Sequence, residues 1–145
     1  MALMQATQTT TAQLAHELRE TVGRVIRRLR VEPGPPFGQL AVLGRLDREG
    51  PASISDLAAA DRMRPQSMAQ TVRDLEDAGL VSRRPDPEDG RRSFVELTPA
   101  GLQTLHATRA RREDWLTQTL DRELDADERE LLRTALTLLN RLADA

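Results

Sequence analysis

The chain has 145 residues, a formal net charge of −2, and 21 basic residues that are all arginine. It has no cysteine, which excludes disulfides, thiolate catalysis, cysteine-based zinc sites and thiol redox sensing. With one Trp, two Phe and no Tyr, the core of a single domain must be aliphatic, which suits packed helices. No stretch approaches the roughly 18 apolar residues of a membrane span, and the polar N-terminus does not look like a signal peptide. We therefore expect a cytoplasmic protein with no membrane partner.

The first two helices are predicted from hydrophobic spacing. Residues 1–10 are expected to form a disordered lead. Residues 11–30 then place apolar side chains at steps of three and four, which is helical periodicity: Leu14, Leu18, Val22, Val25 and Leu29. The segment PGPP at 33–36 ends this helix. A second helix is predicted over 37–49, and Gly50-Pro51 ends it.

Residues 53–78 have the pattern of a helix-turn-helix. Ser53 and Asp56 resemble a capping box, with Asp in the usual Glu/Gln place, that starts a short helix. After a turn at 61–64, Pro65 suits the first position of a second helix, and Gly79 suits its C-terminal end. Within this second helix the apolar positions share one face: Met68, Val72 and Leu75.

Two strands are predicted over 80–84 and 92–97, around a loop rich in Pro and Gly. Four arginines converge on this loop: Arg83, Arg84, Arg91 and Arg92. Three acidic residues partly offset them, so residues 81–92 sum to four positive minus three negative charges, or +1. We expect Asp89 to form a local ion pair with Arg91 that pins the loop and leaves the other arginines outward. Such arginines can enter a narrow minor groove; the alternative is a salt-bridged hairpin with no ligand.

The last two helices are predicted from caps and apolar stripes. Thr98-Pro99 starts a long helix to about residue 120, and Asp125 with Glu128 caps the last one. The first and last helices carry more apolar residues than the core of one subunit explains, which predicts an interface between two copies. Its expected members are Leu14, Leu18, Val22, Leu131, Ala135, Leu138 and Leu142.

A helix-turn-helix followed by a hairpin can present its second helix to the major groove of DNA. The candidates for reading bases are Gln66, Ser67 and Gln70, and Gln can hold adenine N6 and N7 with two hydrogen bonds. Arg64 and Arg73 stand where they could bind phosphates or guanine. With Pro65 and Thr71 these residues make up the predicted recognition surface. The alternative is the polar face of a packed helix.

Three motifs together resemble the MarR family of bacterial transcription regulators: LEDAGLVSR at the end of the recognition helix, D-x-x-D-x-R at Asp86, Asp89 and Arg91, and the closing LTPAG. The resemblance implies a single domain over 1–145. Residues 11–36 and 99–145 would form dimerisation helices, and 37–98 a winged helix-turn-helix. The implied fold is mainly α with a small two- to three-stranded β-wing.

The resemblance also implies an obligate homodimer on a palindromic operator. We expect a transcriptional repressor that binds a pseudo-palindromic operator and has no cofactor. Residues matching Asp89 and Arg91 shape the wing in this family, and basic residues at the wing tip touch the minor groove. Family members often release DNA when a small, frequently aromatic anion binds, so such an effector is expected. Many relatives carry Thr-Arg where this chain has Ala69-Gln70, so its operator is expected to differ.

Two other classes of function fit the sequence less well. An enzyme would need a nucleophile with a base, paired carboxylates in a pocket, or a metal cluster. His16 and His106 are far apart with no motif around either, and no phosphate-binding glycine loop appears. We therefore expect neither catalysis nor a metal site. A winged helix used only for protein contact is the other alternative, and it would not need Gln and Ser on the helix or arginines at the wing.

Overall fold

The computed structural model describes residues 9–145. The first eight residues, most of the predicted lead, lie outside this range. The elements follow in the order α1 (Thr11–Leu29), α2 (Phe37–Glu49), α3 (Ile54–Ala60), α4 (Pro65–Asp77), β1 (Val81–Pro85), β2 (Ser93–Leu97), α5 (Pro99–Glu123) and α6 (Ala126–Ala143). The mainly helical fold with a two-stranded wing confirms the predicted fold class.

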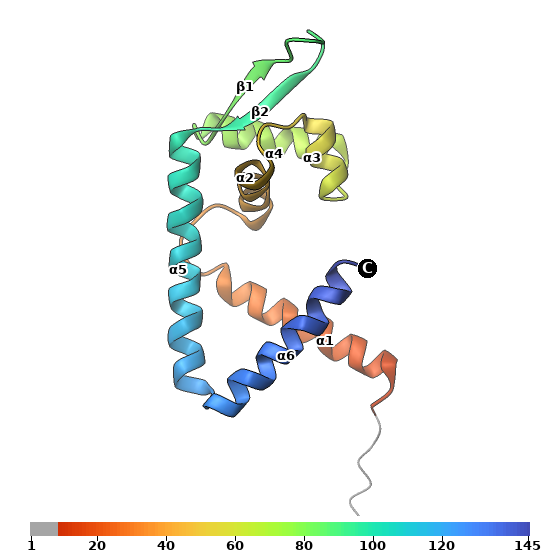
Figure 1. Ribbon diagram of the computed structural model, residues 1–145, viewed down its shortest axis with the longest axis vertical. Helices are drawn as coiled ribbons and strands as arrows, with labels where there is room; N and C mark the ends of the chain where they lie inside the picture. The colour runs from red at the N-terminus through yellow and green to blue at the C-terminus, as the bar shows by residue number, and fades with distance from the viewer. Residues whose placement is uncertain (1–8) are drawn as a thin grey trace, which may run out of the picture.

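The elements form two groups joined by one long helix (Figure 1). At one end lie α2, α3, α4 and the hairpin of β1 and β2, while α1 and α6 cross at the other end. The connecting helix, α5, has 25 residues, which corresponds to a length of about 37 Å. None of the helices among residues 9–145 is both long enough and apolar enough to span a bilayer.

Side-chain caps fix where α1, α3 and α6 begin, and a fourth cap starts α5. Thr10 and Gln13 form a reciprocal capping box at α1, so Thr10 belongs to the helix cap and not to a disordered segment as expected. Asp125 and Glu128 form the predicted capping box at α6. At α3, Ser53 accepts the backbone N–H of Asp56 as predicted. The Asp56 carboxylate does not complete that box, because it is turned toward Arg92 of the wing.

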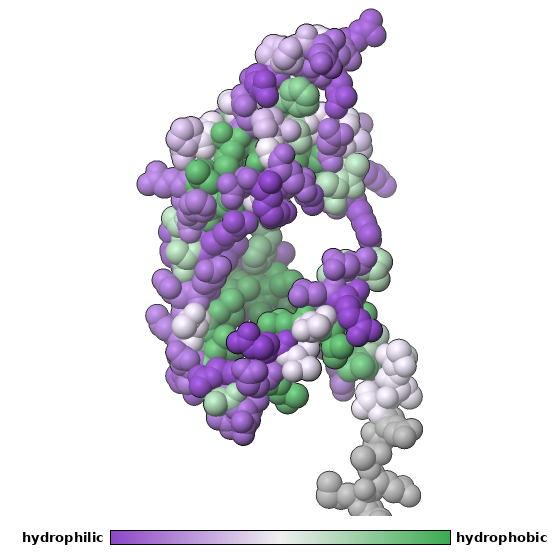
Figure 2. Space-filling view, viewed as in Figure 1, coloured by the Kyte–Doolittle hydropathy of each residue, from purple (hydrophilic) through white to green (hydrophobic). Residues whose placement is uncertain are grey.

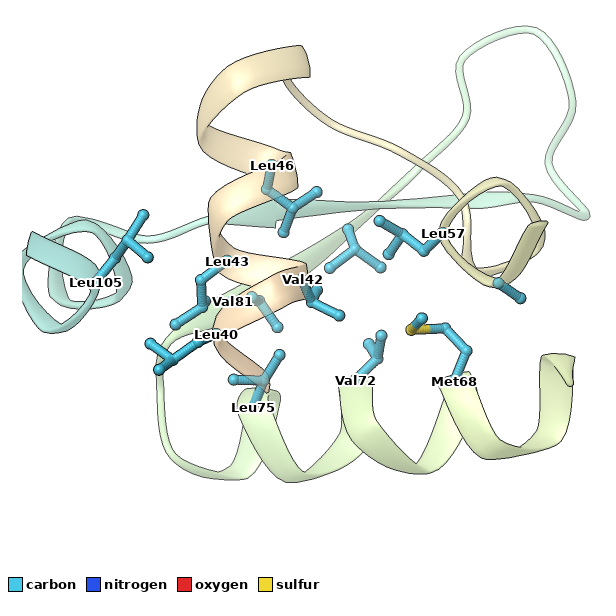
Figure 3. Close-up of a cluster of buried hydrophobic side chains, with 12 residues drawn as sticks. Leu40, Val42, Leu43, Leu46, Leu57, Met68, Val72, Leu75, Val81 and Leu105 are labelled. Carbon is cyan, nitrogen blue, oxygen red and sulfur yellow. The ribbon is translucent and has the colours of Figure 1, made fainter. Parts of the chain in front are cut away.

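The core lies between α2, α3, α4, the hairpin and the start of α5 (Figure 3). Met68, Val72 and Leu75 of α4 are fully buried, as their spacing predicts, and point toward α2. Burying each such side chain contributes about 1.5–3 kcal/mol. The opposite face of α4 is therefore held outward by a core that is entirely aliphatic apart from one methionine. The buried apolar residues are Leu40, Val42, Leu43, Leu46, Leu57, Ala58, Met68, Val72, Leu75, Val81, Val95 and Leu105.

The wing is an antiparallel pair in which Arg83 lies opposite Val95. Val95 also forms a two-way backbone bridge with Ala52, with hydrogen bonds of 2.8 and 3.1 Å. This bridge adds one residue of a third strand just before α3. It attaches the base of the wing to the start of the helix-turn-helix.

The closing LTPAG motif joins α4 to α5 through its threonine and glycine. The Thr98 hydroxyl donates to the Gly79 carbonyl at 2.7 Å and accepts the Gly101 N–H at 3.0 Å. A Cβ on Gly101 would overlap the Leu80 carbonyl oxygen. Only glycine lets α5 begin this close to the end of α4. The long helix therefore holds the group formed by α2, α3, α4 and the hairpin, called the reading end below, at a fixed angle.

The crossing helices leave their apolar faces uncovered. Within residues 9–145, no side chain of α1 or α6 is buried. Leu131 is 72% exposed and Leu142 61% exposed. Figure 2 shows apolar residues gathered in the half of the molecule where α1, α6 and the end of α5 meet, whereas the wing is mostly hydrophilic. A single chain thus exposes a surface typical of an interaction site.

Candidate nucleic-acid interface

The N-terminal turn of α4 is exposed and carries no side-chain cap. Arg64 occupies the N-cap position, Pro65 is the first helical residue, and Gln66 and Ser67 are exposed beside it. The backbone N–H groups of an uncapped first turn have no partner within the helix, and they give this end a partial positive charge. The side chains of Arg64, Gln66 and Ser67, together with the free N–H groups of this turn, therefore form an exposed polar surface suited to phosphates and base edges.

The middle of α4 has a connected set of exposed polar side chains. Gln70 Nε2 donates to Asp74 Oδ1 at 2.9 Å, and Arg73 Nη2 donates to Gln70 Oε1 at 2.8 Å. Gln70 is thus oriented by two neighbours on its own helix. Thr71 differs from the other residues of the predicted recognition surface. It is half-buried, and its hydroxyl donates to the Ser67 carbonyl of its own helix.

The wing tip is closed by hydrogen bonds from backbone N–H groups to two aspartate side chains. The Asp89 carboxylate accepts the backbone N–H of Arg91 at 3.0 Å, and Asp86 does the same for Glu88 at 2.9 Å. The prediction of an Asp89–Arg91 ion pair is wrong in its detail, since the partner is the Arg91 main chain. The loop is still pinned by Asp89, and the Arg91 guanidinium is left exposed.

Three of the four wing arginines are paired with carboxylates of their own subunit. Arg83 lies 3.4 Å from Glu76 of α4, and Arg84 lies 3.3 Å from Glu96 across the hairpin. Arg92 lies 3.4 Å from Asp56 of α3. Arg83 and Arg84 are successive strand residues and point to opposite faces of the hairpin. All four arginines nevertheless stay exposed, as expected, and line one pocket at the wing. Among the described residues, only the Arg91 guanidinium of the four has no carboxylate partner.

Arg62 is a further cation at this surface that the sequence reasoning passed over as part of a turn. It has a φ of 53°, in the left-handed region. Its N–H donates to Ala59 and the following N–H, of Met63, donates to Ala58. This is the Schellman arrangement that ends a helix. Met63 packs on the core, so the arginines on either side of it, Arg62 and Arg64, are the sequence signal that could have indicated a second cation in this turn.

A cavity lies apart from α4, between the end of α1, the α1–α2 connection and α5. Arg112 of α5 lies over the Phe37 ring at 4.2 Å, and Arg30 lies over the same ring at 5.4 Å. The Arg112 Nε is buried without a hydrogen-bond partner. Burial, and secondarily the charge of Arg111, lowers the pKa of Arg112. The lining consists of Arg30, Gly34, Pro35, Pro36, Phe37, Gly38 and Arg112.

The sequence reasoning did not find this cavity. Its cations come from helices far apart in the chain, and only the fold brings them to Phe37. Arg27, Arg28 and Arg30 stand together at the end of α1. Arg28 lies over the Trp115 ring at 4.2 Å and Arg30 lies over the Phe37 ring, so two of the three contact aromatic rings.

An exposed recognition helix beside an arginine-bearing wing defines a winged-helix DNA-binding protein. A family model described as MarR family matches residues 38–93. The chain is 38% identical over 136 residues to an HTH-type transcriptional regulator of Mycobacterium leprae, covering 92% of this chain and 94% of that one. The chain belongs to the MarR family, and it is a helix-turn-helix transcriptional regulator.

Solved structures agree with this assignment. The crystal structure of a transcriptional regulator from Pseudomonas aeruginosa matches with a TM-score of 0.82 and 44% identity, over 92% of this chain and 96% of that one. The PcaV transcriptional regulator from Streptomyces coelicolor, solved in complex with its natural ligand, matches with a TM-score of 0.66 and 28% identity, over 100% and 98% of the two chains.

Proposed function

We propose that this protein is a homodimeric repressor that binds a pseudo-palindromic operator in the cytoplasm. The observation that carries the proposal is the exposed, uncapped start of α4 beside a wing whose Arg91 is left without a carboxylate partner in the described chain. The start of α4 would enter the major groove, and Arg91 would reach the adjacent minor groove. Repression requires only that the dimer occupy promoter DNA.

The dimer is supported by the uncovered apolar faces of α1 and α6. Leu18, Val22 and Ile26 of α1 line a groove together with Leu139 and Leu142 of α6, and the surface around it is apolar. If a two-fold axis related the α1 and α6 helices of two subunits, the two reading ends would lie on opposite sides of that axis. Half-sites on the operator would then be about 10 base pairs apart, which is one turn of B-form DNA.

We also propose a small aromatic anion as the effector, bound at Arg30, Phe37 and Arg112. Two guanidinium groups beside one ring suit a carboxylate on an aromatic body. The buried Arg112 Nε has a hydrogen-bonding capacity that the described chain leaves unmet. Support also comes from PcaV, which was solved with its natural ligand. The cavity touches both the dimer helices and the start of α2, so its occupation would alter the spacing of the reading ends.

The test of DNA binding is selection of bound duplexes from a random pool, followed by affinity measurements at several salt concentrations. The selected sites should be two-fold symmetric. For a dimer with 6–10 phosphate contacts, affinity should fall by about 10³–10⁵-fold between 50 and 200 mM salt. A negligible, flat response would instead favour a winged helix used for protein contact.

The effector test uses benzoate as the ligand and release of the selected operator as the signal. Benzoate should release DNA from the wild-type protein and fail to do so from Arg112→Met. Arg109→Met is the matched control, because Arg109 is an exposed arginine on the same helix and does not line the cavity. Equal responses of the two variants would exclude Arg112 from the effector site.

A further inference from the structure

We propose that Gln70 selects adenine at one position of each operator half-site, and that Asp74 and Arg73 are positioning residues that hold its amide for this purpose. The inference rests on the proposed function and adds to it the identity of one base. It comes from the connected side chains on the exposed face of α4, opposite the buried Met68, Val72 and Leu75.

The two neighbours determine which way the Gln70 amide faces. A carboxylate can only accept hydrogen bonds, and a guanidinium can only donate them. The amide nitrogen must therefore face Asp74, at 2.9 Å, and the amide oxygen must face Arg73, at 2.8 Å. Rotating the amide by 180° would place donor against donor and acceptor against acceptor. Gln70 thus presents one orientation to the solvent.

Counting donors and acceptors shows what this oriented amide can still bind. A glutamine amide has two N–H groups and two oxygen lone pairs. Asp74 takes one N–H and Arg73 takes one lone pair, so one donor and one acceptor remain. In the major groove adenine offers N7 as an acceptor and N6–H₂ as a donor, which is the matching pair. Guanine offers two acceptors, N7 and O6, and would leave the amide oxygen facing another oxygen.

The hydrogen bonds to Asp74 and Arg73 also reduce the side-chain conformational entropy that Gln70 loses when it binds a base. An exposed glutamine normally loses side-chain freedom when it contacts a base, which weakens the interaction. A side chain already held at both ends of its amide loses less. Arg73 has four further N–H donors, so orienting Gln70 does not prevent it from contacting a phosphate.

The first experiment compares base preferences of variants by selection from a random duplex pool. Wild-type protein should select adenine at one position per half-site, and Gln70→Ala should lose that preference. Asp74→Asn and Asp74→Ala both remove the negative charge, but only asparagine keeps an acceptor of the same shape. Asp74→Asn should keep the adenine preference, whereas Asp74→Ala should lower it toward that of Gln70→Ala.

The second experiment tests the two-bond contact directly. Replacing the selected adenine with 7-deazaadenine removes the N7 acceptor. The Gln70 N–H is then left without its acceptor, and wild-type affinity should fall by about 5- to 150-fold, the range expected when one polar partner is left unsatisfied. The Gln70→Ala protein should show no further loss on the modified site. All of these side chains are exposed, and unchanged thermal unfolding of each variant would confirm that the fold is intact.

The outcomes separate this inference from the proposed function. An operator bound without any adenine preference that depends on Gln70 would overturn the inference and leave the proposed function standing. Identical preferences of Asp74→Asn and Asp74→Ala would overturn the positioning role, because they would leave only an effect of charge. Absence of binding to every duplex, even at low salt, would overturn the proposed function and this inference with it.

Discussion

The Arg92 guanidinium of the wing lies 3.4 Å from the Asp56 carboxylate of α3. The same guanidinium donates to the Ser53 hydroxyl at 3.1 Å, and Ser53 is buried at the start of that helix. The bridge between Ala52 and Val95 lies next to this contact. Arg92 thus attaches the wing to the helix-turn-helix, and its charge is already partly balanced within the subunit.

This attachment predicts different roles for two adjacent arginines. Arg91→Ala should reduce the slope of log affinity against log salt by about 1.8, because the dimer loses two cationic contacts to DNA, each contributing about 0.9. Arg92→Ala should lower affinity with a smaller change in slope, because the wing loses its attachment rather than a phosphate contact. The measurement is operator binding over a range of salt concentrations. Equal changes in slope for the two variants would contradict the distinction.

The sequence predicted the backbone of this surface better than its side-chain partners. The bounds of α4 were predicted as observed because Pro65 and Gly79 mark its ends chemically. The first strand was predicted one residue early, since Leu80 belongs to the cap that closes α4, where its N–H donates to Leu75. Local rules of capping and spacing were sufficient for these elements.

The pairings of the arginines depend on contacts that local rules do not contain. Arg92 meets Asp56, and Arg83 meets Glu76, only after the hairpin has packed on α3 and α4. The charge sum of the loop therefore could not show which arginine stays unpaired. The cavity at Phe37 was missed for the same reason, because Arg30 and Arg112 reach it from different helices.

Gly101 and Gly38 should respond in opposite ways to the same substitution. Gly101→Ala would place a Cβ against the Leu80 carbonyl, which is backbone and cannot move aside. We expect a loss of about 2–3 kcal/mol in the free energy of unfolding, as for an overpacked core. Gly38→Ala adds a Cβ to α2 with nothing within 4 Å, and it should stabilise by about 0.5–1 kcal/mol. Urea denaturation of both variants measures the difference.

Substitutions at two residues with left-handed backbone conformation should also change the free energy of unfolding in opposite directions. Gly79 has a φ of 75° and Arg62 a φ of 53°, each just past the end of a helix. Arg62→Gly should stabilise the protein, and Gly79→Ala should destabilise it, each by about 1 kcal/mol. Thermal or urea unfolding checks the signs. If Arg62→Gly were instead destabilising, the Arg62 side chain would have to make a stabilising contact that outweighs its backbone strain.

The dimer predicts that a single charge on α6 separates the subunits. Leu138 is 52% exposed in the single chain, so Leu138→Glu should leave the fold of one subunit intact. In the dimer the new carboxylate would be buried in an apolar interface, which costs several kcal/mol per ion. We expect dimerisation to weaken by at least about 3 kcal/mol, or roughly 100-fold.

Sedimentation equilibrium measures this change, with Asn140→Glu as the control on an exposed polar position of the same helix. The control should remain dimeric at concentrations where Leu138→Glu is monomeric. The monomeric variant should also lose most of its affinity for the full operator, because one reading end then binds one half-site without the gain from linkage to a second. A Leu138→Glu protein that stayed dimeric would place the interface on a different surface.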